Sequence, residues 1–269
     1  MTIGKIIAIA NQKGGVAKTT TSVNLAASLV ATKRKVLLID LDPQGNATMG
    51  SGIDKQKLTY SSYHVLMEEC DIVTAITATE EAGYDLLPAN ADLTAAEVQL
   101  LEIDGRERKL SNALAEIRNQ YHYIFIDCPP SLNMLTLNAL VAADAVLIPI
   151  QCEYYALEGL TALVNTIDEI RSSLNPSLKI EGLLRTMYDP RNRLAADVTM
   201  QLQKYFGDRL YRTVIPRNVR LAEAPSYGVP VLVYDRTSRG AQAYLALAGE
   251  IVRREQQQQR VRPTNAVLA

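Results

Sequence analysis

Six stretches of the chain are apolar on consecutive positions, which is typical of short strands buried on both faces of a sheet. They are KIIAIAN (5–11), KVLLID (35–40), YIFIDCP (123–129), AVLIPIQ (145–151), IEGLLRTMY (180–188) and YRTVIP (211–216). Between them, apolar residues recur at every third or fourth position, as they do along one face of a helix. The clearest stripe runs from Leu157 to Ile170, and the last runs from Ala241 to Val252. The pattern predicts strands and helices in alternation.

Such alternation predicts right-handed βαβ units and therefore an α/β fold, with a doubly wound, mostly parallel sheet and helices on both of its faces. The 269 residues are enough to bury a large core. No linker, repeat or change of composition divides the chain, so residues 1–255 are expected to form a single domain. The Gln-rich end, residues 256–269, is expected to be a disordered tail.

The net charge of -1 hides an uneven distribution of charged residues. Residues 58–105 contain ten acidic residues and no Lys or Arg. Residues 185–220 contain eight basic and three acidic residues, a net charge of +5. A basic cluster of this kind is either solvated surface or a face that binds a polyanion, and the charge pattern alone leaves both interpretations open.

The cysteines and histidines are isolated in the sequence. Cys70, Cys128 and Cys152 show no CxxC spacing, and His64 and His122 are far from one another. This argues for a reducing compartment, and against a disulfide framework or a zinc site. The N-terminal apolar stretch is too short for a signal peptide, and no apolar run is long enough to span a membrane. The expectation is a cytoplasmic protein without a membrane segment.

The segment NQKGGVAKTTT (11–21) follows the first predicted strand and has the composition of a phosphate-binding loop. Gly14 and Gly15 allow backbone N–H groups to point at phosphate oxygens, and the N-terminus of the next helix adds its positive end. Lys18 is expected to reach the β- and γ-phosphates, and the Thr19 hydroxyl to bind Mg²⁺. The alternative is an ordinary Gly-rich turn, which is less consistent with Lys-Thr at the start of the helix.

Ala17 occupies a position where such loops usually have glycine. The backbone there often adopts a conformation that costs a residue with a Cβ atom about 1 kcal/mol or more. Alanine is the smallest replacement, so weakened or slightly reshaped nucleotide binding is expected.

Acidic residues follow the second and third predicted strands. Asp40 ends KVLLID, and Asp42, two residues later, is expected on the same side. A carboxylate here can hold a metal-bound water or orient the water that attacks the γ-phosphate. Asp127 ends YIFID, the pattern of the acid that orders Mg²⁺. Each Asp alone could be a turn or cap residue, although Pro129 and Pro130 disfavour a helix directly after Asp127. The expected chemistry is metal-assisted nucleotide hydrolysis by positioning, without a covalent intermediate.

Five segments together resemble the signatures of the ParA/Soj partition ATPases, which are deviant Walker-A P-loop NTPases that move chromosomes and plasmids. They are KGGVAKTT, LIDLDPQGNAT, FIDCPPSL, PIQCEYYALEGL and VIPRNVRLAEAPSYG. The resemblance runs in order from about residue 4 to residue 253. It implies ATP and Mg²⁺ as cofactors, and slow hydrolysis of ATP to ADP and phosphate.

The resemblance also implies a role for a second lysine in the loop. In this family, the lysine at the front of the loop reaches across a dimer and touches the partner's phosphates, and Lys13 matches it. Lys18 matches the phosphate lysine, and Thr19 matches the Mg²⁺ ligand. Asp42 matches the carboxylate that orients water near the metal, and Asp127 matches the Walker B acid. The nucleotide-binding residues implied are Lys13, Gly14, Gly15, Val16, Ala17, Lys18, Thr19 and Thr20, with an adenine pocket at Pro216, Arg217 and Asn218.

The partners implied are double-stranded DNA, a second copy of the chain and a ParB-like protein. Family members bind DNA without sequence preference as ATP-dependent homodimers, and Arg191 and Arg220 match their DNA-binding positions. Both arginines lie in the basic segment, which favours its interpretation as a DNA face and a location on the nucleoid in the cytoplasm. A centromere-bound ParB-like protein is expected to stimulate hydrolysis through its N-terminal segment. Whether the cargo is a chromosome, a plasmid or a protein cluster is left open.

Two other classes share the loop. A MinD-like positioning ATPase needs an amphipathic C-terminal membrane helix, which EQQQQRVRPTNAVLA (255–269) does not supply because of its Gln run and Pro263. A metabolic ligase or kinase needs a dedicated substrate pocket, which no segment of the sequence indicates.

Overall fold

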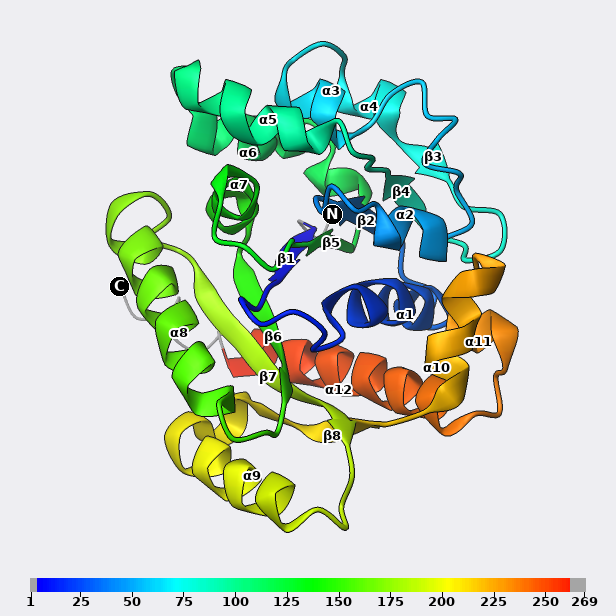
Figure 1. The fold of residues 1–269 in the computed structure, drawn as a ribbon, viewed down its shortest axis with the longest axis vertical. Coiled ribbons are helices and arrows are strands. Elements are labelled where there is room, and N and C mark those ends of the chain that lie inside the picture. The colour runs from blue at the N-terminus through cyan, green and yellow to red at the C-terminus, as the bar shows by residue number, and fades with distance from the viewer. Residues whose placement is uncertain (1–3, 262–269) are drawn as a thin grey trace.

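An eight-stranded sheet lies between two layers of helices in the computed structural model, which describes residues 4–261 (Figure 1). The strands are β1 (Lys5–Ile9), β2 (Val36–Asp40), β3 (Thr77–Ala78), β4 (Asp85–Leu87), β5 (Tyr123–Asp127), β6 (Ala145–Gln151), β7 (Lys179–Tyr188) and β8 (Leu210–Pro216). Their order is β3-β4-β2-β5-β1-β6-β7-β8, and every pairing is parallel except that of β3 with β4. The predicted doubly wound, mostly parallel sheet is confirmed.

Helices connect the strands and cover both faces of the sheet. The α-helices are α1 (Lys18–Val30), α2 (Asn46–Gly50), α3 (Ser62–Leu66), α4 (Ile72–Ala75), α5 (Leu93–Gln99), α6 (Lys109–Ala115), α7 (Met134–Ala142), α8 (Ala156–Ser173), α9 (Arg193–Phe206), α10 (Val219–Glu223), α11 (Val231–Tyr234) and α12 (Arg239–Val261). Short 3₁₀ turns are η1 (Leu100–Glu102), η2 (Arg106–Arg108), η3 (Arg118–Gln120), η4 (Gly207–Arg209) and η5 (Ala224–Tyr227).

The two faces of the sheet belong to two apolar clusters. On β1, Ile6 and Ala8 pack with α3 to α9, whereas Ile7 and Ile9 pack with α1, α2 and α10 to α12. Because successive side chains of a strand point to opposite faces, a strand covered on both sides must be apolar at every position. This is why the strand sequences read as continuous apolar runs.

All six strands predicted from these runs are present, with ends within two residues of the predicted ones. The strands β3 and β4 were not predicted. They are two and three residues long and lie in the acidic segment 58–105. A strand this short gives no periodic pattern. The place of β4 is set by its pairing with β2, and that of β3 by its pairing with β4.

The last helix extends beyond the predicted end of the folded domain. α12 continues to Val261, so residues 256–261 are helical where a disordered tail was expected. Glutamine has a good helix propensity, and an existing helix is extended at little cost. Residues 262–269 of the expected tail lie outside the described residues.

The amino ends of the strands are joined to the C-terminal part of α12 by a polar cluster. The Lys5 ammonium lies 2.9 Å from the Glu181 carboxylate and 3.2 Å from that of Glu255. The Tyr123 hydroxyl donates to Glu255 at 2.5 Å. The cluster fixes β1, β5, β7 and α12 at the edge of the sheet opposite to the phosphate-binding loop.

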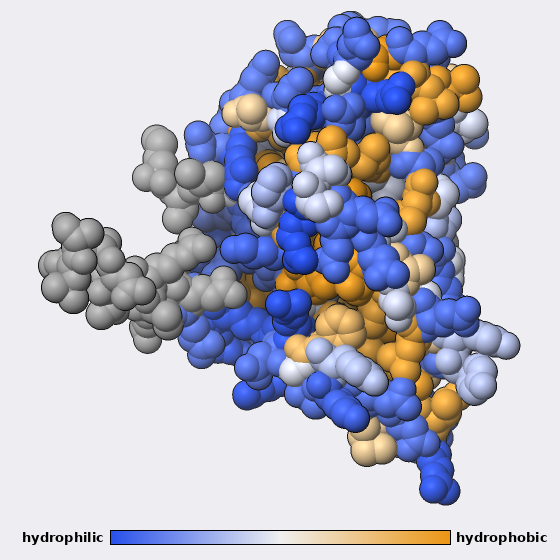
Figure 2. All heavy atoms as spheres, turned by 90° about the vertical axis from the view of Figure 1, so that its left-hand side faces the viewer, coloured by the Kyte–Doolittle hydropathy of each residue, from blue (hydrophilic) through white to orange (hydrophobic). Residues whose placement is uncertain are grey.

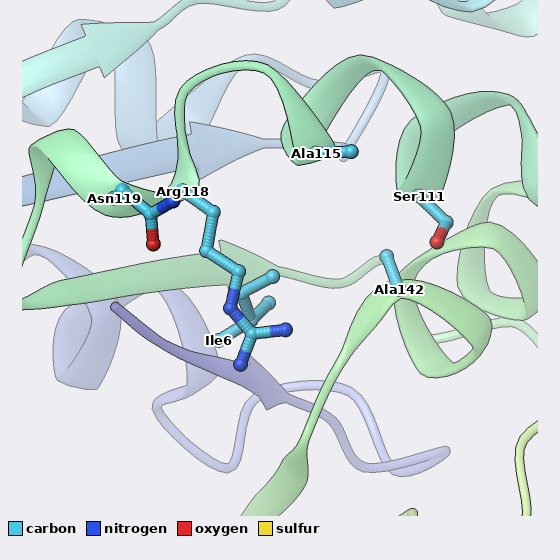
Figure 3. A pocket seen from close by; sticks show the side chains of 6 residues that line it. All are labelled: Ile6, Ser111, Ala115, Arg118, Asn119 and Ala142. Atoms are coloured by element: carbon cyan, nitrogen blue, oxygen red, sulfur yellow. The ribbon is translucent and has the colours of Figure 1, made fainter. Parts of the chain in front are cut away.

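A pocket of about 360 Å³ lies at this same edge (Figure 3). Its lining residues are Ile6, Ser111, Ala115, Arg118, Asn119 and Ala142. The Arg118 guanidinium donates to the carbonyl oxygen of Gly4 and to both carboxylate oxygens of Asp144. Its charge is thus engaged in an ion pair that joins β1 to the start of β6.

Candidate nucleotide-binding site

The predicted nucleotide loops meet at the carboxyl edge of the sheet. β5 lies between β1 and β2, and Asp127 pairs in register with Ile9 on one side and with Asp40 on the other. The loops that follow these three strands therefore begin side by side. This is the edge at which open α/β sheets bind ligands.

The phosphate-binding loop connects β1 to α1. Gly15 and Ala17 both have left-handed backbones, with φ angles of 71° and 68°. Among the described residues, no side chain caps the N-terminus of α1, and its first turn contains no acidic residue. The first N–H groups of α1 are therefore available to an anion, as phosphate loops require.

The backbone at Ala17 has the conformation that glycine adopts most readily, with φ 68° and ψ 37°. The Thr186 hydroxyl, at the end of β7, donates to the carbonyl oxygen of Val16 at 2.9 Å. This bond from a buried residue holds the loop in place. The left-handed backbone expected to strain Ala17 is thus present, and the hydrogen bond from Thr186 of β7 offsets part of its cost.

Replacing Ala17 by glycine tests this strain. The left-handed backbone costs alanine about 1 kcal/mol or more, whereas glycine loses about 0.4–1 kcal/mol more chain entropy on folding. We therefore expect Ala17→Gly to raise the free energy of unfolding by up to about 1 kcal/mol and to leave ATP affinity equal or better. Urea unfolding and titration with a fluorescent ATP analogue measure both quantities. A clear loss of either would contradict the strain argument.

Lys18 places a nearly buried ammonium group at the loop. Its exposed fraction is 7%, and its Nζ atom lies 3.4 Å from the carbonyl oxygen of Lys13. Burial lowers the pKa of Lys18, and the nearby carboxylates of Asp127 and Asp42 oppose this shift. A cation that has lost its water and has few partners suits a ligand with several anionic oxygens.

Asp127 is fully buried beneath the first turn of α1. It accepts hydrogen bonds from the Thr19 hydroxyl at 2.7 Å and from the Ser22 hydroxyl at 2.8 Å. Burial and the neighbouring Asp40 raise the pKa of Asp127 to about 8, although both hydrogen bonds act in the opposite direction. Ser22 was not predicted from the sequence, but it lies one turn after Lys18 and bonds its carbonyl oxygen as well.

Asp40 and Asp42 differ in their surroundings. Asp40 is fully buried and accepts from the backbone and hydroxyl of Thr48 at 2.8 and 2.7 Å, and from the Asp42 N–H at 3.1 Å. Burial raises the pKa of Asp40 to about 6. Asp40 therefore fixes the loop and α2 in place.

Asp42 lies in the turn that Asp40 supports. Its carboxylate accepts from the Gln44 N–H at 2.9 Å, and its exposed fraction is 9%. Gly45, with φ 59°, completes the turn, and a Cβ atom there would lie 2.7 Å from the carbonyl oxygen of Ala89. Of the two acids, Asp42 is the less buried, and its role toward a ligand stays a prediction.

Lys13 is held away from its own loop by an acidic residue that was not predicted. Its ammonium lies 2.6 Å from Glu153, and the two side chains are 40% and 47% exposed. Its backbone N–H donates to Asn11, whose amide donates to the carbonyl oxygen of Pro149. The loops after β1 and β6 are thus joined around Lys13. Glu153 lies within the motif PIQCEYYALEGL, which was the available signal.

The predicted adenine segment lies farther along the same edge. Pro216 ends β8, and Asn218 precedes α10, while β6 and β7 separate β8 from β1 in the sheet. The side-chain oxygen of Asn218 is buried and has no hydrogen-bond partner within residues 4–261.

The two arginines predicted to bind DNA follow β7 and β8 and are both paired with acids. Arg191 donates to both carboxylate oxygens of Asp189, at 3.0 and 2.8 Å. Arg220, on α10, lies 2.7 Å from Glu223 and 3.4 Å from Asp235. Exposed ion pairs of this kind are weak, so an approaching phosphate can take the place of either acid.

No helix in the described part of the chain has both the length and the apolar character needed to cross a membrane.

Comparison with known proteins identifies the family. The family model described as an AAA domain matches residues 4–180, more than half of the chain. The sporulation initiation inhibitor protein Soj of Bacillus subtilis is 53% identical over 249 residues, which cover 93% of this chain and 98% of Soj. The chromosome partitioning protein ParA of Caulobacter vibrioides is 52% identical over 257 residues, which cover 95% and 96% of the two chains.

A solved structure shares the fold and part of the sequence. Cobyrinic acid a,c-diamide synthase from Mycobacterium smegmatis, with bound ATP analog and magnesium, has a TM-score of 0.83 and 39% identity over 94% of this chain and 96% of that one. Its name is that of a metabolic enzyme, but its sequence is less similar to this chain than the sequences of the two partition proteins are. The chain belongs to the ParA/Soj family of partition ATPases.

Proposed function

We propose that ATP joins two copies of this partition ATPase face to face, and that the joined pair binds double-stranded DNA without sequence preference. Hydrolysis, stimulated by a ParB-like centromere-binding protein, then releases it from DNA. The names of the Soj and ParA relatives support a role in chromosome partition. The single observation that carries the proposal is the position of Lys13, which is paired with Glu153 and not with its own phosphate-binding loop.

The residues at the carboxyl edge fit MgATP. Lys18 supplies a buried cation for the phosphates, and the loop of residues 13–20 supplies N–H groups. Thr19 and Asp127 offer adjacent oxygen atoms of the kind that Mg²⁺ prefers. The bound metal would neutralise phosphate charge and favour the charged form of Asp127. Asp42 would orient the attacking water, and residues 216–218 would hold the adenine.

Lys13 would act in the partner's site. An ammonium supplied by the second subunit stabilises charge that develops on the transferred phosphoryl group, as an arginine finger does. The site is then complete only when two ATP-loaded subunits meet. Nucleotide state therefore determines association state.

The DNA surface would be built from the basic segment 185–220. One subunit can reach few phosphates, and two subunits joined by ATP reach twice as many, so DNA binding is expected to depend on ATP. Such binding would place the protein on the nucleoid in the cytoplasm.

Charge changes around Arg220 test this surface. We expect Arg220→Glu to weaken binding to all duplexes alike and to flatten the plot of log affinity against log salt, by about 0.9 for each phosphate that the protein no longer neutralises. Glu223→Gln removes the acid that competes with phosphate for Arg220, so it should strengthen binding. The measurement is retention on unrelated duplexes over a salt series, with ATP and with ADP.

The control for Glu223→Gln is Glu102→Gln, which removes one negative charge at an exposed position in the acidic segment. It should leave DNA affinity unchanged. Binding that is equal in ATP and ADP, or that is indifferent to both Arg191→Glu and Arg220→Glu, would exclude this surface. Pelleting with lipid vesicles then tests the membrane alternative.

A further inference from the structure

The end of α2 and the segment that carries Arg220 are in backbone contact through two glycines. Gly52, two residues after α2, and Gly228, directly after η5, have left-handed φ angles of 84° and 67°. A Cβ atom at Gly52 would lie 2.9 Å from the carbonyl oxygen of Gly228, and one at Gly228 would lie 3.0 Å from Cα of Gly52. Because α10 continues directly into η5, residues 219–228 rest on α2 (Figure 1). We refer to residues 219–228 as the α10 segment.

α2 is in turn connected to the turn that contains Asp42. Both the backbone N–H and the hydroxyl of Thr48, in the middle of α2, donate to one carboxylate oxygen of Asp40, at 2.8 and 2.7 Å. The Asp42 N–H donates to the other oxygen of the same carboxylate at 3.1 Å. Asp42 and α2 are therefore held by one buried group, and a displacement of one is passed to the other.

α11 is held by a different element of the nucleotide site. The side-chain oxygen of Asn24, on α1, accepts from the Val231 N–H at the start of α11, at 2.7 Å. The side-chain amide of Asn24 donates to the carbonyl oxygen of Thr20, one turn earlier on α1, also at 2.7 Å. Asn24 is buried. α11 is thus fixed to α1 and the phosphate-binding loop, whereas the α10 segment is fixed to α2 and Asp42.

The joint between the α10 segment and α11 lies at the surface. Arg220 pairs with Asp235, directly after α11, at 3.4 Å, and the Tyr234 hydroxyl donates to Glu223 at 3.3 Å. The rings of Tyr227 and Tyr234 lie 4.9 Å apart. These polar contacts are longer than those that hold α2 and α11, and exposed ion pairs are weak. The joint is therefore the part of this arrangement that opens most easily.

We propose that the contact between Gly52 and Gly228 couples the γ-phosphate of ATP to Arg220 within one subunit. This inference rests on the proposed function. Asp42 moves toward the γ-phosphate, and α2 and the α10 segment move with it, while Asn24 keeps α11 on α1. The pair of Arg220 with Asp235 opens, and Arg220 becomes free to bind a DNA phosphate.

The consequence is a DNA surface that is switched in each subunit as well as doubled by association. ADP has no γ-phosphate, so Asp42 is not displaced and Arg220 stays paired with Asp235. Gly52 and Gly228 act as positioning residues for Arg220, because only glycine allows the two backbones to approach so closely.

Gly228→Ala tests the contact, because the added Cβ atom forces the α10 segment away from α2. The ratio of DNA affinity in ATP to that in ADP should fall about fivefold or more, while ATP-dependent dimerisation remains. Fluorescence anisotropy with a labelled duplex of unrelated sequence measures DNA affinity, and light scattering measures dimerisation.

The matched control is Gly105→Ala. Gly105 has φ 67° and ψ 20°, and Gly228 has φ 67° and ψ 25°. A Cβ atom at Gly105 meets no other atom of the described residues within 4 Å. The control therefore introduces the same backbone strain without the steric conflict, and its ratio should equal that of the unchanged protein.

Asp235→Asn tests the joint. Asparagine weakens the pair with Arg220 but keeps the side-chain oxygen that accepts from the Thr237 N–H at 3.0 Å. DNA affinity in ADP should rise about two- to fivefold, as expected for the loss of an exposed ion pair, and affinity in ATP should hardly change. A change of net charge alone would raise affinity equally in both nucleotides. Glu102→Gln, at an exposed position, is the charge control and should alter neither.

These two changes lie away from the helices on the other side of the molecule. α2, α10 and α11 are on the right-hand side of Figure 1, on the far side from the face that Figure 2 shows with polar ridges and apolar recesses. Gly228→Ala and Asp235→Asn therefore leave that face unaltered.

The coupling and the proposed function fail in distinguishable ways. If the unchanged protein binds DNA equally in ATP and ADP, the proposed function fails. If the unchanged protein prefers ATP, but Gly228→Ala and Gly105→Ala keep or lose the ratio alike, the contact carries no coupling and the DNA function stands. Loss of dimerisation in Gly228→Ala would trace the ratio to association and overturn the coupling. Asp235→Asn leaves the backbone unchanged and decides the matter if Gly228→Ala does not fold: equal gains in ATP and ADP would overturn the coupling.

Discussion

Replacing Lys13 by alanine should lower the stimulated rate of ATP hydrolysis by about a hundredfold or more, because the partner's γ-phosphate loses a cation that acts in the transition state. ATP-dependent dimerisation should weaken as well, while ATP binding to the single subunit should remain. The reason is structural: the Lys13 ammonium is bound to Glu153 and does not contribute to its own phosphate-binding loop. Light scattering with ATP and with ADP measures dimerisation, and phosphate release measures turnover.

One control separates the Lys13 cation from its ion pair, and a second variant separates dimerisation from hydrolysis. Glu153→Gln removes the acid but keeps Lys13, so dimerisation and hydrolysis should persist. Asp42→Ala should still dimerise in ATP but hydrolyse slowly, because the water-orienting carboxylate is lost. Equal dimerisation in ADP, or normal turnover by Lys13→Ala, would contradict a site shared between subunits.

Gly14→Val examines the same interface by steric means. A Cβ atom at Gly14 meets no other atom of the described residues within 4 Å, so the single subunit has room for a valine side chain. The added side chain should therefore spare ATP binding and prevent two loops from approaching one another. Dimerisation that is unaffected by Gly14→Val would show that the loops do not meet.

Replacing Lys18 by alanine should weaken ATP binding about a hundredfold or more, since a buried charge pair that loses one partner costs about 3–5 kcal/mol. Lys18 is 7% exposed, and its burial lowers its pKa while Asp127 and Asp42 raise it. With the lysine removed, these carboxylates would repel the phosphates directly. Equilibrium titration with a fluorescent ATP analogue measures the loss.

The control for Lys18→Ala is Lys57→Ala, which removes a cation whose side chain is 83% exposed and paired with Asp54. It should bind ATP as the unchanged protein does. Undiminished binding by Lys18→Ala would remove residues 13–20 from the nucleotide site.

The central strands were predictable because burial on both faces demands apolar residues at every position, as Ile6 and Ile7 on β1 show. The marginal strands β3 (Thr77–Ala78) and β4 (Asp85–Leu87) were not predictable, because each is too short to show a periodic pattern. The extent of α12 was underestimated because glutamines were interpreted as a tail, although they are good helix formers.

The position of the phosphate-binding loop and of Asp127 was predictable because parallel strands present their carboxyl ends at one edge. The distinct surroundings of Asp40 and Asp42 were not predictable. Asp40 fixes the loop through its hydrogen bonds with Thr48, which lies eight residues away on α2. The ion pairs of Lys13 with Glu153 and of Arg220 with Asp235 join distant segments. Sequence spacing contains no information about such pairs.

The polar cluster around Lys5 has a practical consequence for imaging. Lys5 and Glu255 are joined at the amino edge of the sheet, so the start of β1 and the C-terminal part of α12 lie on the side away from residues 13–20. Arg191 and Arg220 follow the carboxyl ends of β7 and β8, at the opposite edge. We therefore expect a label joined at Gly4 or Val261 to leave residues 13–20 unobstructed, whereas an insertion at Gly45 or Arg191 would lie at the same edge of the sheet as those residues.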